Sequence, residues 1–212
     1  MQSIAISRTL WRGEPLVLAS RSEGRARILR NACIPYSIVP SPINERSIEQ
    51  GFSDSPAKLA ALLAHAKAKS VSSGCPGRFV LGADQVLSIE TEILHKSESR
   101  GEAISKLSML SGREHCLHSA ISLVRNEEIL FEHVSTVVVK MADIDDATIE
   151  AYADLAGDAL EKSVGGYEIE GPGSSLIERI DGDYFSVIGL PLLPLFTYCR
   201  RVGLIGANGS PP

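Results

Sequence analysis

Apolar and polar residues alternate along the chain with two different periods, and together these periods predict alternating strands and helices. Short apolar or alternating runs are typical of strands. They occur at residues 15–20, 34–40, 78–89, 113–126, 128–141, 165–171 and 174–189. Apolar residues three and four apart are typical of helices. This pattern occurs at residues 20–32, 54–73, 98–110, 143–157 and 191–203, and residues 42–54 are predicted to be a loop.

Local signals indicate where these elements begin and turn. Ser55 precedes Pro56 at the start of the longest predicted helix, an arrangement typical of a helix N-terminus. Residues 126–128 are predicted to be the turn of a long hairpin. Because no linker interrupts the pattern, residues 15–205 are predicted to form a single α/β domain. Residues 1–14 are predicted to be an N-terminal extension, and residues 206–212 a disordered tail.

The composition narrows the classes of partner. The chain has 212 residues and a formal net charge of −5. Proteins that bind nucleic acid usually present a basic face and aromatic side chains for stacking, so an RNA-binding module is disfavoured. The longest apolar stretch near the end is broken by Pro191 and Pro194, and it falls short of the roughly 20 residues of a membrane span. We therefore expect no nucleic-acid partner and no membrane partner.

The N-terminus and the cysteines bear on the compartment. The first residues lack the apolar core of a secretory signal. The four cysteines are widely spaced and include no CxxC pair, which is typical of free thiols in a reducing compartment. Both observations predict a cytoplasmic protein.

The turn LASRSEGRAR, residues 18–27, is the first candidate for chemistry. It joins a predicted strand to a helix, and the N-terminus of a helix offers free N–H groups and a partial positive charge to a phosphate. Ser20 and Ser22 add hydroxyl donors, and Arg21 and Arg25 add guanidinium groups that match phosphate oxygens. The alternative is a serine-capped helix with solvated arginines. The sequence GxxxxGK[ST] of a P-loop is absent.

Asp84 is the second candidate, because it interrupts the apolar strand VLGADQVL, residues 80–87. An ionised carboxylate buried without compensation costs several kcal/mol. A bound divalent cation would keep it ionised, so Asp84 is predicted to be a metal ligand or a general base. The alternative is an aspartate at a strand end that accepts hydrogen bonds from backbone amides.

Four further positions gain meaning only in combination. Lys96 follows the strand of Asp84, Lys67 lies on the longest helix, and Glu45 lies in the predicted loop. Each of them alone is typical of a solvated surface charge. The segment GGYEIEG, residues 165–171, is predicted to be a strand with Glu170 on its polar face, and the alternative there is an amphipathic edge strand.

Several separated motifs resemble the Maf family of nucleoside triphosphate pyrophosphatases. They are LASRSEGRARIL near the start, GADQVL, LSGREH at 110–115, GGYEIEG, and IDGDYFSVIGLPL at 180–192. The resemblance runs from about residue 16 to residue 203. It implies an elongated mixed α/β sheet with flanking helices and a cleft between two lobes, similar to inosine triphosphatases.

The resemblance also implies a reaction. The family hydrolyses a nucleoside triphosphate between the α and β phosphates with a divalent cation, Mg²⁺ or in its place Mn²⁺ or Co²⁺. The family's functional positions correspond here to Ser20, Arg25, Glu45, Lys67, Asp84 and Lys96. Among these, the carboxylates of Asp84 and Glu45, together with Glu170, are the expected metal ligands. A homodimer is also implied. The family is associated with arrest of septum formation, so the alternative of another class is a nucleotide-binding regulator of cell division without turnover.

Three positions bear on which nucleobase the substrate carries. The family's discriminating positions correspond to Gly24, Gln85 and Glu170. Gln85 and Glu170 resemble the branch that acts on 7-methyl-GTP, whereas Gly24 stands where that branch often carries a tryptophan. The alternative substrates are dTTP and UTP. The chain also departs from the family pattern at His95-Lys96-Ser97, where GKP is usual, at Asn44, and at Ser163.

Overall fold

The computed structural model describes residues 9–206, which build one seven-stranded mixed sheet. Its strands are β1 (Leu16–Leu18), β2 (Tyr36–Ile38), β3 (Val80–Ile89), β4 (Glu92–Leu94), β5 (Glu114–Arg125), β6 (Glu128–Met141) and β7 (Ile177–Asp181). The order is β2-β1-β3-β5-β6-β7, and β4 pairs with β3. β1 is parallel to β2 and β3, and the remaining pairs are antiparallel. The predicted mixed α/β fold is confirmed.

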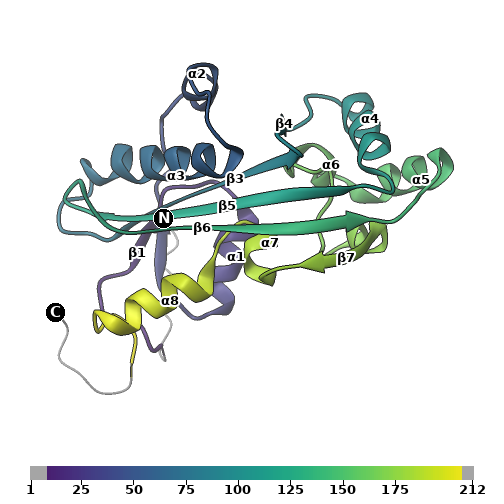
Figure 1. Ribbon diagram of the computed structural model, residues 1–212. Helices are drawn as coiled ribbons and strands as arrows, with labels where there is room; N and C mark the ends of the chain where they lie inside the picture. The colour runs from purple at the N-terminus through teal and green to yellow at the C-terminus, as the bar shows by residue number, and fades with distance from the viewer. Residues whose placement is uncertain (1–8, 207–212) are drawn as a thin grey trace.

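Helices cover both faces of this sheet. They are α1 (Glu23–Asn31), α2 (Glu45–Gln50), α3 (Pro56–Ser72), α4 (Arg100–Leu110), α5 (Asp146–Ala156), α6 (Ala159–Lys162), α7 (Tyr184–Ile188) and α8 (Leu192–Arg201), with a 3₁₀ helix at Pro172–Leu176. Figure 1 shows α3 on one face, and α1 and α8 on the other. Helices α4, α5 and α6 gather at the far end of the long strands. None of the helices within residues 9–206 combines the length and apolar character that a bilayer span requires.

The strand β3 joins two hydrophobic clusters. Its residues Leu81 and Ala83 belong to the cluster formed with α1 and α8. Leu87 and Ile89, on the same face of the strand, belong to the cluster formed with α4 and α5. Because alternate residues of a strand share a face, Gln85 lies between the two clusters on that face. The two clusters therefore meet at the middle of β3.

Several sequence predictions are confirmed in detail. The longest helix begins at Pro56, directly after Ser55. The long hairpin turns at Asn126 and Glu127, since Arg125 pairs with Glu128. Both turn residues have positive φ angles, 52° and 66°, as a tight two-residue hairpin turn requires.

Other predictions were wrong. The predicted loop 42–54 contains α2, which begins where the side chain of Asn44 accepts a hydrogen bond from Ser47 N. A helix of six residues is too short to show an apolar period. The predicted strand 165–171 is a series of turns, because Gly166 has φ +76° and no strand pairs with the segment within residues 9–206. The predicted strand 174–189 is only β7, followed by α7. The short helix α6 was not predicted.

The predicted terminal segments lie partly outside the described residues, at 1–8 and 207–212. Within the predicted N-terminal extension, Trp11 is 6% exposed and packs in the cluster with α1 and α8. It also forms an isolated bridge with Ile205. Residues near both ends of the described chain are therefore held together against the core.

Candidate active site

The candidate site lies where β3 lacks a neighbour along one edge. Within residues 9–206, β3 pairs with β1 as far as Leu81 and with β4 from Leu87 onward. Residues 82–86 are paired on their other side with β5, so one edge stays unpaired between the two short strands. A cavity of about 1610 Å³ is lined by residues 84–86 of this stretch. Asp84 and Gln85 point to opposite faces of the strand, and both line the cavity because it lies at the gap.

The close packing of α3 against β3 brings the first charges together. A Cβ added at Gly82 would lie 2.1 Å from the carbonyl oxygen of Ala64, so only glycine allows this approach. Lys67 lies one helical turn after Ala64 and is directed at the strand. Its Nζ donates a hydrogen bond to Asp84 Oδ1 at 2.6 Å. The glycine of the GADQ motif therefore sets the distance between helix and carboxylate.

Glu45 completes a charge cluster with this pair. Its Oε2 lies 2.8 Å from Lys67 Nζ, so two carboxylates share one ammonium group. Asp84 is 6% exposed and Lys67 is 7% exposed. The attraction between them offsets the cost of removing both charges from water. The charge of the buried Asp84 is thus compensated by Lys67, and its burial by itself does not require a metal ion.

Arg25 is buried beside the gap rather than solvated. One of its terminal nitrogens donates hydrogen bonds to the carbonyl oxygen of Ala83 at 2.8 Å and to Ser20 Oγ at 3.0 Å. Its Nε donates to the carbonyl oxygen of Gly189 at 2.9 Å. Burial lowers the pKa of Arg25 below its ordinary value, and the negative charge of Asp84 opposes that shift. Arg25 therefore connects α1, the open edge of β3 and the end of α7 around the cavity.

The start of α1 forms one wall of the cavity. Ser22 caps the helix, and its Oγ accepts a hydrogen bond from Arg25 N at 3.4 Å. Ser20, Arg21, Ser22 and Gly24 line the cavity. A Cβ added at Gly24 would lie 3.2 Å from Ile188 Cγ2, so this wall is tightly packed against α7. The structure brings the predicted phosphate-binding turn to the same cavity as Asp84.

Lys96 adds a positive charge from the loop after β4. It lines the cavity together with Lys67 and Glu45. Partial burial lowers the pKa of Lys96, and the positive charge of Arg25 acts in the same direction. An anionic ligand in this cavity would relieve that repulsion.

Gln85 is held in one orientation. Its Nε2 donates hydrogen bonds to Ser119 Oγ at 2.9 Å and to the carbonyl oxygens of Ser186 and Val187, each at 3.0 Å. Backbone carbonyl oxygens only accept, so the amide nitrogen has to face them. The side chain lines the cavity, and its amide oxygen is the atom left to meet a ligand.

Glu170 lines the cavity but lies apart from the carboxylates of the cluster. It forms an ion pair with Arg27 of α1, and both side chains are partly exposed. The turns at residues 165–171 place it there, in contact with α1. The structure therefore gathers Asp84 and Glu45 around Lys67, and it does not bring Glu170 into that group.

The donor set suits a hard divalent cation. Mg²⁺ prefers oxygen ligands and is usually bound by one or two carboxylates together with waters and substrate phosphates. Asp84 and Glu45 approach the same nitrogen in a cavity with ample room. Among residues 9–206, no three or more His, Cys, Asp or Glu side chains are gathered as a ligand group. The residues present therefore fit a cation that takes its other ligands from water and from a bound anion.

Sequence reasoning missed the residues that hold the site in place. Ser119 and Ser186 orient Gln85, and Glu102 and Lys106 hold the loop of Lys96. Lys106 had a signal in the sequence, because the helical period puts it on the same face as Leu107 and Leu110. A lysine at such an apolar position points inward. No sequence pattern indicated that the carbonyl oxygens of Ser186 and Val187 would accept hydrogen bonds from Gln85.

Comparisons with known proteins identify the family of the chain. The family model described as Maf-like protein matches residues 15–202. A nucleoside triphosphate pyrophosphatase of Rhodopseudomonas palustris (strain BisB18) is 47% identical over 199 residues, covering 93% of this chain and 98% of the relative. A 7-methyl-GTP pyrophosphatase of Brucella abortus biovar 1 (strain 9-941) is 44% identical over 189 residues, covering 88% and 95%.

A solved structure of a HAM1 protein from Coxiella burnetii overlaps only partly. It has 20% identity and a TM-score of 0.39, and the overlap covers 61% of this chain and 73% of that chain. The family model spans nearly all of the described chain, from β1 to the end of α8. The chain belongs to the Maf family.

Proposed function

We propose that this protein hydrolyses a nucleoside triphosphate between the α and β phosphates, releasing a nucleoside monophosphate and pyrophosphate. The observation that carries the proposal is the cluster in which Lys67 bridges Asp84 and Glu45 at the open edge of β3. A buried carboxylate beside several cations is suited to bind a polyphosphate and activate water. The names of the relatives with 42–48% identity support the same reaction class.

Each residue of the cavity has a role in this proposal. Asp84 orients the attacking water and accepts its proton. Lys67 and Lys96 bind phosphate oxygens and stabilise the charge that grows on the leaving pyrophosphate. Ser20, Ser22 and the N–H groups at the start of α1 hold the phosphate next to the nucleoside, and Arg21 supplies charge at the rim. A divalent cation held by Asp84 and Glu45 would neutralise the phosphates and polarise them for attack.

In this proposal Arg25 mainly holds the walls of the cavity together and does not bind the phosphates directly. Two of its nitrogens donate to protein oxygens, among them the carbonyl oxygens of Ala83 and Gly189. Its charge still contributes to the positive potential of the cavity. We therefore assign Arg25 to the support of the phosphate-binding wall rather than to a free guanidinium fork.

For the base we propose 7-methylguanine. A base methylated at N7 carries a positive charge, which a carboxylate favours and an amide favours less. Glu170 would supply that carboxylate, and the fixed amide oxygen of Gln85 would accept a hydrogen bond from the base. The Brucella abortus relative with 44% identity is named for this substrate. The alternative substrates are dTTP and UTP.

We expect Glu170→Gln to change the choice of base more than the best rate. Loss of the negative charge should lower the ratio of kcat/KM for 7-methyl-GTP to kcat/KM for UTP by about tenfold. A hydrogen bond to a charged group contributes about 1.5–3 kcal/mol and a neutral one, which glutamine can still form, about 0.5–1.5 kcal/mol, a difference of roughly 1.4 kcal/mol. Steady-state kinetics on both substrates measures this ratio. An unchanged ranking of substrates would remove Glu170 from the account of specificity.

The reaction itself is tested by the identity of the products. The purified protein is incubated with 7-methyl-GTP, UTP, dTTP or CTP, with Mg²⁺ and with EDTA instead. We expect monophosphate and pyrophosphate in equal amounts, and no release without the cation. Release of orthophosphate would contradict cleavage between the α and β phosphates. Tight binding of a triphosphate without any release would favour a nucleotide-binding regulator instead.

A further inference from the structure

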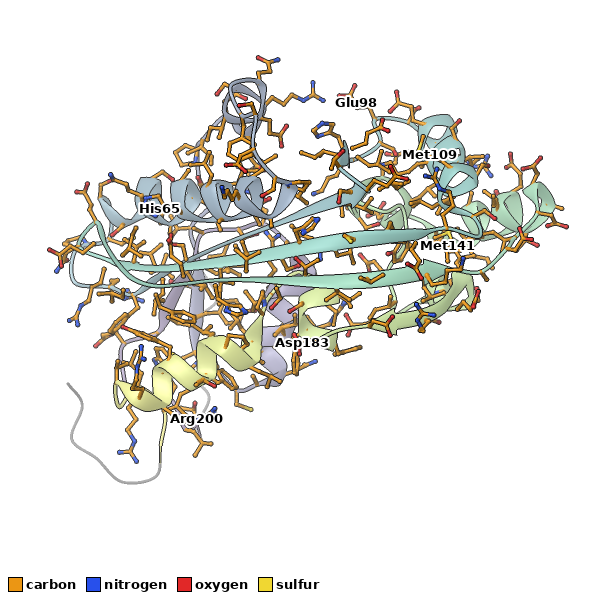
Figure 2. All side chains as sticks on the ribbon, in the orientation of Figure 1. His65, Glu98, Met109, Met141, Asp183 and Arg200 are labelled. Atoms are coloured by element: carbon orange, nitrogen blue, oxygen red, sulfur yellow. The ribbon has the colours of Figure 1, made fainter. Side chains whose placement is uncertain are left out.

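The loop between β4 and α4 carries Lys96, and both of its ends are bound to α4. At its first end, Lys106 Nζ donates a hydrogen bond to the carbonyl oxygen of His95. At its last end, Glu102 Oε2 accepts a hydrogen bond from Glu98 N at 2.8 Å. Figure 2 shows Glu98 in this position, between α2 and α4. The peptide bond between His95 and Lys96 and the one between Ser97 and Glu98 are thus both held by α4.

The two holding residues are adjacent on the helix surface. Glu102 and Lys106 are four residues apart, so they lie one above the other on one side of α4. Their chemistry is complementary to the loop, since the carboxylate accepts an N–H and the ammonium donates to a carbonyl oxygen. Together they hold a loop of four residues, 95–98, that lines the cavity.

Lys106 also binds a second segment that lines the cavity. Its Nζ donates a second hydrogen bond to the carbonyl oxygen of Val164 at 3.1 Å. Val164 begins the turns that carry Tyr167, Glu168 and Glu170 to the cavity wall. One ammonium group therefore joins the loop of Lys96 to a second segment of the same cavity wall.

The burial of the Lys106 ammonium group is unfavourable for the free energy of folding. It is 9% exposed, and burial lowers its pKa below the ordinary value, with the negative charge of Glu102 opposing the shift. No carboxylate within residues 9–206 forms an ion pair with it, and its partners are two neutral carbonyl oxygens. A buried ammonium with such partners is less favourable for folding than an apolar side chain of similar volume. Stability alone does not account for a lysine here.

We propose that Lys106 and Glu102 are positioning residues for the reaction, which hold Lys96 in place to bind the phosphate chain. This inference rests on the proposed function. Misplacement of a phosphate-binding group by about 1 Å can lower a rate by about 100-fold, so a fixed loop has a direct kinetic value. Lys106 does not line the cavity and Glu102 lines it only at the loop that it holds, so both are assigned a role through Lys96.

A double-mutant cycle tests whether Lys106 acts through Lys96. Removing the phosphate ligand by Lys96→Ala should lower kcat/KM by roughly 100-fold. Lys106→Met keeps the length and apolar contacts of the side chain, and it should lower kcat/KM by about tenfold. When Lys106→Met is combined with Lys96→Ala, it should lower kcat/KM by a further factor of less than about three. The lysine that Lys106 positions is already absent from that variant. Fully multiplied effects would contradict the proposal, as would normal kinetics in Lys106→Met.

Glu102 provides a second test that does not depend on a buried residue. Glu102 is exposed, so Glu102→Ala should fold normally and still lower kcat/KM, with the same loss of effect in the Lys96→Ala background. Glu102→Gln should restore most of the activity, because an amide oxygen can accept the hydrogen bond from Glu98 N. Lys69→Met and Glu178→Ala change exposed residues outside the cavity, and they should leave the kinetics unchanged. Failure of Glu102→Gln to restore activity would contradict the positioning role.

The positioning role of Lys106 can be tested even if the protein does not hydrolyse triphosphates. If the wild-type protein releases no pyrophosphate from any triphosphate, the proposed function fails. The same cycle is then measured by calorimetric binding of inorganic pyrophosphate, where Lys106→Met should weaken binding only when Lys96 is present. Absence of pyrophosphate binding by the wild-type protein would overturn both.

Discussion

Replacing Asp84 with asparagine is expected to lower kcat by about 10³-fold, because a positioned general base contributes about 10²–10⁴-fold to a rate. Asparagine has nearly the same volume, so the packing between α3 and β3 is retained. Lys67 keeps Glu45 as a partner at 2.8 Å, so the loss of stability should be smaller than for a fully unpaired buried charge. Pyrophosphate release under saturating triphosphate measures the effect, and circular dichroism verifies the fold.

A matched control is available at another aspartate. Asp183 caps α7, where its Oδ2 accepts hydrogen bonds from Ser186 N and Ser186 Oγ. Asparagine can also cap a helix, so Asp183→Asn should leave turnover near normal. Near-normal turnover in a folded Asp84→Asn protein would instead refute the role assigned to Asp84.

Replacing Arg25 with methionine is expected to have the largest effect on stability. The change leaves the carbonyl oxygens of Ala83 and Gly189 without their donor in a buried region. Each buried polar group left unsatisfied costs about 1–3 kcal/mol, so the free energy of unfolding should fall by about 2–6 kcal/mol. Urea denaturation followed by circular dichroism measures this loss.

Arg21 is the control for that prediction. It lies on the same turn and is exposed at the cavity rim, so Arg21→Met should change the free energy of unfolding by no more than about 0.5 kcal/mol. Equal stability of the Arg25→Met and Arg21→Met proteins would mean that Arg25 does not hold the three segments together. The comparison separates a structural arginine from one that only contributes charge.

Much of the fold followed from local patterns. The apolar period of residues 54–73 and the Ser55-Pro56 start predicted α3, and alternation predicted the hairpin of β5 and β6. The failures arose where local pattern and tertiary context disagree. Glu168, Ile169 and Glu170 alternate like a strand, but the positive φ of Gly166 and the absence of a pairing strand within residues 9–206 turn the segment instead.

In the candidate site, too, the sequence determined some features and the tertiary structure determined others. Residue type and apolar surroundings selected Asp84, because a buried charge requires a partner. Lys67, Glu45 and Lys96 were selected only because they match functional positions of the family. Which partner compensates Asp84 was decided only by the close approach of α3 at Gly82, which brings Lys67 to 2.6 Å. The helical period could have marked Lys106 as an inward lysine, yet its acceptors on His95 and Val164 lie on distant segments. Local sequence encodes side-chain chemistry and backbone preference, whereas contacts between distant segments depend on how the whole chain packs.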